Sequence, residues 1–410
     1  MEDAAMPLTP LPRLLACLIS AGLTVQAHNI DTNQVSDTYL SAIIVPDEAE
    51  IGSTTQVWLG ALYGGQWFLR NAIGGWQAFE GSYPVAIPGL TLGPVNAINI
   101  SQGLDLSSLP GLEVYLGYGN SVAAFNNTPG HLRKVHTVTP AGSAGLSAAV
   151  DVTRLPMGDG KISSKPTRGS IWACTTTGGV GGASQTGPWI RGDGTYDLTA
   201  KLSVIGSVPW SGNFSAVVSG SSRIISGNGL PGHTTGSYPI ANSDPAYQYD
   251  RNPNSIKGQT VSLTLPALPQ LAASSSCLPG GAIGILTSGV VIFNGLDAEN
   301  RDAVAHEVQD RCQGHPERNG SYHYHNISTC IAEKAEPAEH SPLVGYAYDG
   351  FGIYGRYGEG GKLLSNADLD ECHGHTHTLD WDGQQRSLYH YHATWEYPYT
   401  LGCFRGNRVR

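Results

Sequence analysis

Charged side chains are scarce in this sequence. Asp, Glu, Lys and Arg make up 14% of its 410 residues, against about 25% in an average soluble domain. Coiled coils and helical bundles need charged outer faces, so both are disfavoured. Glycine and proline, with 53 and 25 copies, are in contrast abundant, which is typical of short strands joined by many turns. We therefore predict a mainly β protein with minor α.

Basic residues are too few for a nucleic-acid-binding protein. The chain has 23 Lys and Arg against 33 Asp and Glu, a formal net charge of −10, whereas binding to a phosphate backbone needs a basic face. Beyond residue 27, no apolar run reaches the roughly 18 residues of a membrane-spanning helix. We expect a small molecule or an extracellular polymer as substrate, with no nucleic acid and no membrane span.

The first 27 residues have the features of an export signal. Arg13 precedes an apolar run over residues 14–25, and Val25-Gln-Ala27 is a small-residue cleavage pattern. Residues 1–27 are therefore predicted to be a signal peptide, and the mature protein to be secreted, in the periplasm or outside the cell. Cleavage would make His28 the first residue, where its amine and ring together could bind copper.

Removal of Cys17 with the signal peptide leaves six cysteines, none in a Cys-x-x-Cys pair. An even number of cysteines in an exported chain predicts disulfides. Thiolate ligation of a metal is the alternative, but export and spacing favour bridges. The pairing we favour is Cys174 with Cys277, Cys312 with Cys330, and Cys372 with Cys403.

A run of small, uncharged residues divides the chain. Residues 139–152 are predicted to be a linker. Residues 28–138 hold alternating apolar runs between turns, which predicts an N-terminal β-sandwich domain. Residues 153–410 are predicted to form a compact, disulfide-stabilised α+β domain. In the first domain, Trp58, Trp67 and Trp76 could stack on a sugar, and burial in the core is the alternative.

Histidine is concentrated in the second predicted domain, where ten of the 14 histidines lie between His306 and His392. This window belongs to an internal duplication, in which three segments recur with offsets of 60 to 67 residues. We expect two units packed about a pseudo-twofold axis within one domain. The paired segments are 284–293 with 345–354, Asp310–His315 with Asp370–His375, and Tyr322-His-Tyr-His325 with Tyr389-His-Tyr-His392.

The repeated tetrapeptide indicates metal chemistry. Side chains alternate along a strand, so both imidazoles of each copy face one side, with the tyrosines behind them. Two imidazoles can share a metal ion, and the upstream Gly-His of each repeat can supply a third ligand. Hydrogen bonding within a rigid core is the alternative role. Whether the copies build two sites or one shared site stays open. The candidate ligands are His306, His315, His323, His325, His375, His390 and His392.

One segment, residues 301–311, is predicted to be a helix. Asp302, His306 and Asp310 would then share a face at i, i+4 and i+8. Glu307 is a candidate general base, although the zinc-hydrolase pattern His-Glu-x-x-His is incomplete because residue 310 is Asp. Asp349, near the second histidine group, is the other candidate proton acceptor.

Taken together, these motifs resemble a known family. The segment from about Arg154 to Gly406 is similar to the YHYH domain, which is named for this tetrapeptide. The resemblance implies an exported or surface protein and no particular activity or catalytic residue. The similar segments include 292–298, 302–312, 314–316, 322–325, 345–350, 368–375 and 389–392.

We thus expect a secreted multi-histidine metalloprotein, and a metal-dependent enzyme in particular. Zinc and copper both suit imidazole. Zinc would favour hydrolysis by an activated water, and copper would favour oxidation. The alternative is a non-catalytic metal-binding protein, or a surface-adhesion protein in which the histidines are structural.

Overall fold

A computed structural model describes residues 30–409 except 37–38, 103–105, 107–108, 129, 139–150, 177–180, 329 and 332–339. The predicted signal peptide, His28 and most of the predicted linker lie outside the described residues. Within them the chain is mainly β, with several sheets and two short α-helices, as the composition predicts. No helix in this part of the chain is long and apolar enough to cross a membrane.

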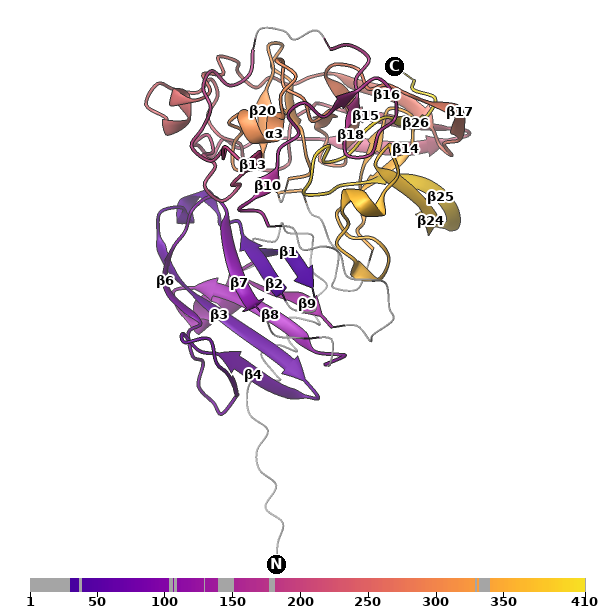
Figure 1. Ribbon diagram of the computed structural model, residues 1–410. Helices are drawn as coiled ribbons and strands as arrows, with labels where there is room; N and C mark the ends of the chain where they lie inside the picture. Colours follow the sequence, from indigo (N-terminus) through magenta and orange to yellow (C-terminus); the bar gives the residue numbers. More distant parts are fainter. Residues whose placement is uncertain are drawn as a thin grey trace, which may run out of the picture.

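Two antiparallel sheets around one apolar core make up the N-terminal part (Figure 1). Their strand orders are β1-β2-β7 and β5-β4-β3-β8-β9, with β6 paired to β3. Alternation along β3 turns Val57, Leu59 and Ala61 into this core and turns Trp58 and Gly60 to the other face. The strands are β1 Ile30–Ser36, β2 Tyr39–Ile44, β3 Thr54–Tyr63, β4 Gln66–Arg70, β5 Trp76–Ala78, β6 Ile87–Thr91, β7 Asn96–Gln102, β8 Glu113–Gly119 and β9 Leu132–Thr137.

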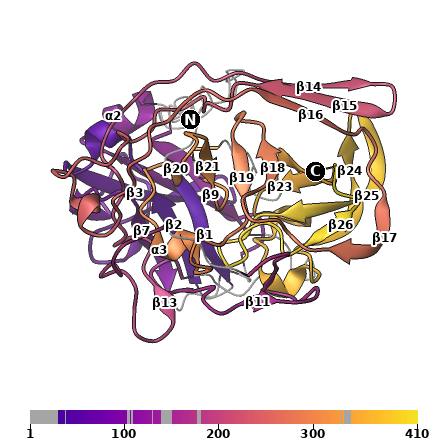
Figure 2. The same cartoon turned by 90° about the horizontal axis from the view of Figure 1, so that it is seen from above.

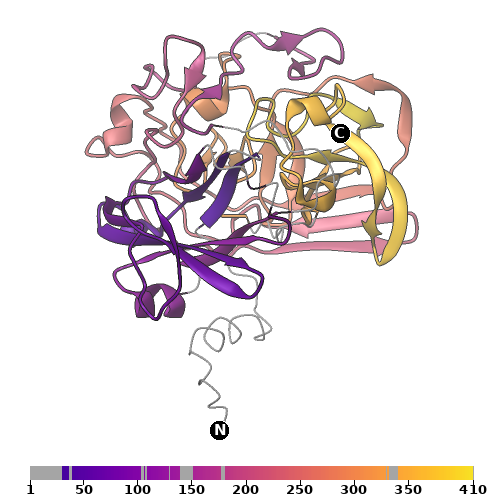
Figure 3. The ribbon, with the colours of Figure 1, turned by 60° about the horizontal axis from the view of Figure 1, so that its bottom comes forward.

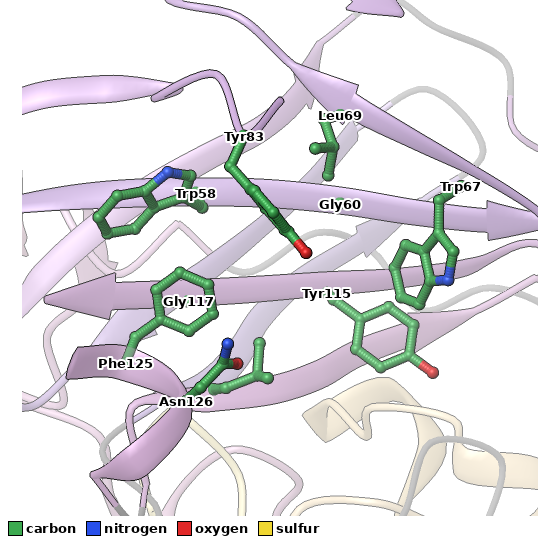
Figure 4. A pocket seen from close by; sticks show the side chains of 10 residues that line it. Trp58, Gly60, Trp67, Leu69, Tyr83, Tyr115, Gly117, Phe125 and Asn126 are labelled. Atoms are coloured by element: carbon green, nitrogen blue, oxygen red, sulfur yellow. The ribbon is translucent and has the colours of Figure 1, made fainter. Parts of the chain in front are cut away.

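The outer face of the larger sheet forms an aromatic pocket (Figure 4). Trp58 is buried and its ring lies 4.9 Å from that of Phe125, which helix α2 (Val122–Asn127) supplies. Trp67 packs 5.0 Å from Tyr115. At Gly117 a Cβ atom would lie 3.1 Å from the Phe125 ring, so glycine leaves room for this packing. Sugar stacking by these tryptophans stays a prediction.

The C-terminal part is built on an eight-stranded sheet with the order β20-β21-β19-β18-β22-β23-β25-β24 (Figure 2). The antiparallel pair β18–β22 lies in the middle. On each side follow an antiparallel, a parallel and an antiparallel pairing, so the order is symmetric about the middle. The strands are β18 Ala282–Leu286, β19 Val291–Phe293, β20 Gly314–Pro316, β21 Tyr322–Tyr324, β22 Leu343–Ala347, β23 Gly352–Tyr354, β24 Gly374–Trp381 and β25 Gln384–His392.

Smaller sheets surround this central one. In the sheet β14-β15-β16, Arg223 forms an ion pair of 2.7 Å with Asp382, in the turn between β24 and β25. The remaining elements are β10 Leu155–Pro156, β11 Ile162–Ser163, β12 Ile171–Trp172, β13 Thr195–Tyr196, β14 Phe214–Ser219, β15 Ser222–Gly227, β16 Val261–Pro266, β17 Leu271–Ser276, β26 Phe404–Gly406, and the 3-10 turns η1 Glu48–Glu50, η2 Pro245–Gln248, η3 Glu359–Gly361 and η4 Asn366–Asp368.

The helix expected over residues 301–311 is much shorter than predicted. Helix α3 spans Ala303–His306, and Asp302 caps its first turn by accepting hydrogen bonds from two backbone N–H groups. The chain becomes extended at Glu307, with φ −75° and ψ 144°. Asp302 and Asp310 therefore do not share a helical face. The sequence pattern was misleading because capping and tertiary hydrogen bonds outweigh helix propensity here.

All three predicted disulfides are present in the structure: Cys174–Cys277, Cys312–Cys330 and Cys372–Cys403. The second and third follow the same Asp-x-Cys turn in the two halves of the sheet. Asp310 and Asp370 each accept the backbone N–H of the cysteine two residues later at 2.9 Å. The bridges therefore fasten the turns that precede His315 and His375.

The N-terminal sheets pack against the C-terminal part (Figures 1 and 3). Ile43 of β2 and Val45 just after it belong to the larger, C-terminal apolar core. An ion pair of 3.3 Å between Arg311 and Asp47 adds a polar contact at the same junction. The proposed boundary at residues 139–152 stays a prediction.

Candidate metal centres

Strand register brings three histidines together in each half of the central sheet. His315 on β20 lies opposite His323 on β21, and His375 on β24 lies opposite His390 on β25. The second histidine of each Tyr-His-Tyr-His segment points to the same face as the first because it lies two residues further along. The two segments thus produce two separate groups.

Cluster 1 consists of Glu307, His315, His323 and His325, all of them buried. Ligand atoms of the three histidines lie within 4.8 Å of one another. The Oε2 atom of Glu307 lies 3.3 Å from the Nε2 atoms of both His315 and His325. The short helix α3 ends just before Glu307. The extended backbone of Glu307 directs its carboxylate to the imidazoles.

Backbone contacts orient the imidazoles of cluster 1. The Nδ1 atom of His325 is 2.6 Å from the carbonyl oxygen of Asn294, and that of His323 is 3.2 Å from the carbonyl oxygen of Ser321. A carbonyl accepts hydrogen bonds and cannot donate them, so each Nδ1 carries the proton. Each neutral ring then presents the lone pair of Nε2, which is the usual state of a metal-binding histidine.

Cluster 2 consists of five histidines: His340, His375, His377, His390 and His392. The Nε2 atom of His390 lies 3.0 Å from that of His375 and 3.1 Å from that of His392. The Nε2 atom of His340 is also 3.1 Å from that of His392. His390 and His392 are fully buried, whereas the other three are half-buried.

Three Nε2 lone pairs converge in cluster 2 with no proton between them. The Nδ1 atoms of His340, His390 and His392 contact the carbonyl oxygens of Ser341, Leu388 and Gly355 at 2.7, 3.0 and 2.6 Å. Each Nδ1 therefore holds the single ring proton. Facing lone pairs repel one another, and a cation between them turns this repulsion into attraction.

Burial keeps these groups in the uncharged state. Desolvation lowers the pKa of His325 to about 4. Desolvation, together with the neighbouring His375, lowers the pKa of His390 to about 2. The pKa of Glu307 is raised well above its ordinary value, by burial first and then by the nearby carboxylates Asp250 and Asp297. The histidines are thus ready to act as ligands at neutral pH, and a cation would favour the ionised form of Glu307.

Tyrosine–aspartate pairs support both copies of the motif from behind. Tyr322 donates to Asp310 at 2.9 Å, and Tyr389 donates to Asp370 at 3.0 Å. On the same side, Tyr391 donates to Asp349 at 2.6 Å. Asp349 therefore lies behind the strand that carries His390 and His392, and the structure does not bring this predicted proton acceptor into cluster 2.

His306 is also placed outside both clusters. Its Nε2 atom lies 2.8 Å from Oδ2 of Asp159. The other six predicted ligands and Glu307 do lie in the clusters. Sequence reasoning missed His340 and His377. His377 repeats the His-x-His spacing with His375 and could have been found by it, whereas His340 comes from a distant segment with no motif.

Each cluster borders a cavity. A cavity of about 600 Å³ is lined by all four residues of cluster 1 and extends to Arg251 and Arg318. A second cavity, of about 440 Å³, is lined by His340 and His377 of cluster 2, together with Tyr354 and Trp381. A small molecule that enters either cavity can therefore reach the histidines of that cluster.

Comparison with known families places cluster 1 within a described domain. Residues 262–362 match the model of the YHYH protein family. This segment is similar to a YHYH domain. It contains all of cluster 1 and His340, but it ends before the other four histidines of cluster 2. No curated protein and no solved structure matches the chain.

Proposed function

We propose that this YHYH domain protein is a secreted metalloprotein that binds one transition-metal ion at each cluster. The observation that carries the proposal is the convergence of Nε2 lone pairs in cluster 2. Nitrogens bound tetrahedrally to zinc at about 2.0–2.1 Å are about 3.3 Å apart, close to the 3.0–3.1 Å between these atoms. A core of structural histidines would place a proton between such nitrogens.

Cluster 1 has the features of a catalytic centre. Three imidazoles leave a coordination position open on a metal, and the cavity gives a small molecule access to it. A zinc ion there would supply an activated water. Glu307 lies 3.3 Å from two of the imidazoles, and in this proposal it takes the proton from that water and returns it to a leaving group. We therefore favour a metal-dependent hydrolase.

Cluster 2 supports a second candidate function. Its five donors are all imidazoles, a set that suits copper as well as zinc. Tyr354 lies 4.9 Å from His390 between ring centroids, so an oxidisable aromatic ring adjoins the cluster. This ring favours copper chemistry, and thus an oxidoreductase, at cluster 2. A metal-storing role with no catalysis is the remaining alternative for this cluster.

Export is supported by the three disulfides, since such bonds persist in oxidising compartments. The predicted cleavage after Ala27 completes the proposal. N-terminal sequencing of the protein from its native host should begin at His28. A chain that retains residues 1–27 would contradict the export signal.

The decisive experiment is a metal analysis of residues 28–410 purified without a histidine tag. We expect two equivalents of zinc or copper by mass spectrometry, after reloading if the ions are lost in purification. The double variant His390→Ala/His392→Ala should lose one equivalent. His306→Gln, which changes an imidazole outside both clusters, is the control and should keep both. Protein that stays metal-free after reloading with either ion would favour structural histidines and the surface-adhesion alternative.

A further inference from the structure

The cavity above cluster 1 has a distinctive distribution of charge. Cluster 1 forms part of its wall, and the exposed residues Arg251 and Arg318 lie on its lining. The chain has a net charge of −10, so two cationic side chains beside one cavity oppose the overall electrostatic field. Whether acidic side chains pair with these two arginines therefore decides the charge of the ligand that the cavity attracts.

The carboxylates that line this cavity already have partners. Asp297 is paired with Arg301 at 2.8 Å. Asp250 accepts the backbone N–H groups of Val308 and Asn252, both at 3.0 Å. None of these contacts involves the two arginines of the lining.

Two further carboxylates, Glu307 and Glu317, line the cavity. Glu317 accepts the backbone N–H groups of Asn319 and Ser321 at 2.9 and 3.2 Å. Glu307 faces the imidazoles of cluster 1. All four acidic groups of the lining are thus engaged elsewhere.

Arg251 and Arg318, in contrast, have no acidic partner in the part of the chain that the structure describes. Among the described residues, neither has a carboxylate oxygen within 4.0 Å. The guanidinium group of Arg251 lies 5.4 Å from the centre of the Tyr247 ring, a contact that leaves its N–H groups available. Guanidinium groups bind carboxylate and phosphate oxygens through paired hydrogen bonds.

Hydrogen bonds fix both arginine segments beside cluster 1. Asn252 and Asn254 donate to the carbonyl oxygen of Pro316, at 2.9 and 3.4 Å. The backbone N–H of Lys257 donates to Gly320 at 2.8 Å. Pro316 directly follows the ligand candidate His315. The loop that carries Arg251 is therefore tied to the turn that carries Arg318, and this turn continues from cluster 1.

We propose that the cavity binds a small molecule with an oxyanion group, which Arg251 and Arg318 hold while its reactive part faces the metal ion of cluster 1. This inference rests on the proposed function, because it assigns the substrate class of the same site. Carboxylates and phosphates share the required chemistry. The second cavity lacks it: Thr378 stands 60 residues after Arg318, and Asp380 and Asp382 are in its lining.

The test is calorimetric titration of the zinc-loaded protein with inorganic phosphate and, separately, with acetate. We expect saturable binding of at least one of them, weakened at least tenfold in Arg251→Ala/Arg318→Ala, since hydrogen bonds to charged groups are the stronger ones. The matched control is Arg168→Ala/Arg408→Ala, which removes the same charge from two exposed positions outside the cavity. This control should bind as the unchanged protein does.

The two anions distinguish the possible sources of the oxyanion. Tighter binding of phosphate would assign a phosphorylated substrate, and tighter binding of acetate a carboxylate. Equal affinity in the two double variants, or no binding by zinc-loaded protein, would overturn the inference while the metal sites stand. Failure to load zinc at all would instead refute the proposed function, and this is measured independently on the same samples.

Discussion

Cluster 1 and cluster 2 occupy corresponding strands of one sheet, yet their surroundings differ. His315, His323 and His325 correspond to His375, His390 and His392 in strand position and register. Cluster 1 adds the buried carboxylate Glu307, whereas Ala367 stands 60 residues later. Cluster 2 instead adds His340 and His377, and three of its five histidines are half-buried. The repeated motif therefore fixes three imidazoles, and residues outside it decide charge and access.

The largest expected effect concerns the independence of the two clusters. His323→Ala/His325→Ala should abolish metal binding at cluster 1 and leave one equivalent at cluster 2. His390→Ala/His392→Ala should do the reverse. Each double change removes two ligands, so we expect the affinity of the altered site to fall by more than about 100-fold. Metal analysis of both variants checks this, and loss of both equivalents in either one would show a single shared site.

Acid should destabilise the metal-free protein through both clusters. His325 and His390 have folded pKa values of about 4 and about 2, below the ordinary 6.5. The unfolded chain therefore takes up protons that the folded chain refuses as the pH falls below 6.5. Each histidine should cost about 3 kcal/mol of stability by pH 4, at about 1.4 kcal/mol per unit. Of these two histidines, only His390 should add to the cost below pH 4.

Urea unfolding at pH 7, 5.5 and 4 measures this effect. Glu307 acts in the opposite direction because its raised pKa favours the protonated, folded form as the pH falls. The histidine contribution is therefore best measured in a Glu307→Gln background. Replacement of His325 or His390 by Gln should flatten the pH dependence, and an unchanged slope in both variants would contradict the assignment.

Glu307→Gln is also the single substitution that best distinguishes metal binding at cluster 1 from metal binding at cluster 2. Loss of the anionic oxygen should weaken zinc binding at cluster 1 about tenfold, with cluster 2 unaffected. The metal-free variant should be more stable than the parent at pH 7, because a buried carboxylate is replaced by a neutral amide. Competition with a coloured chelator reports both affinities. Equal weakening at the two clusters would indicate a global change of fold instead.

The smallest effect should come from the supporting tyrosines. Tyr322→Phe should cost about 1–2 kcal/mol, since it removes one of the donors to the buried Asp310. The Asp370 side chain is 29% exposed, and water can replace the hydroxyl of Tyr389. Tyr389→Phe should therefore cost less. Comparison of the two unfolding free energies tests whether burial, and not the motif, sets the contribution of each pair.

Much of this arrangement could be read from local patterns in the sequence. Alternation along a strand placed His323 beside His325, and the even number of cysteines in a chain expected to be exported predicted disulfides, which are present. Contacts between distant segments could not be read in this way. Asp302 became a helix cap, His306 paired with Asp159, Asp349 turned to the tyrosine side, and His340 joined cluster 2 from a segment with no motif. Each outcome depends on a tertiary partner remote in the chain.

The strand order of the central sheet also determines how the two bound ions would influence one another. Strands β21 and β25 are five steps apart, which at about 4.8 Å per step separates the clusters by about 24 Å along the sheet. This distance exceeds two screening lengths of physiological salt, about 8 Å each. Loading one ion should therefore leave the affinity for the other unchanged, so that a metal titration follows two independent, non-cooperative isotherms.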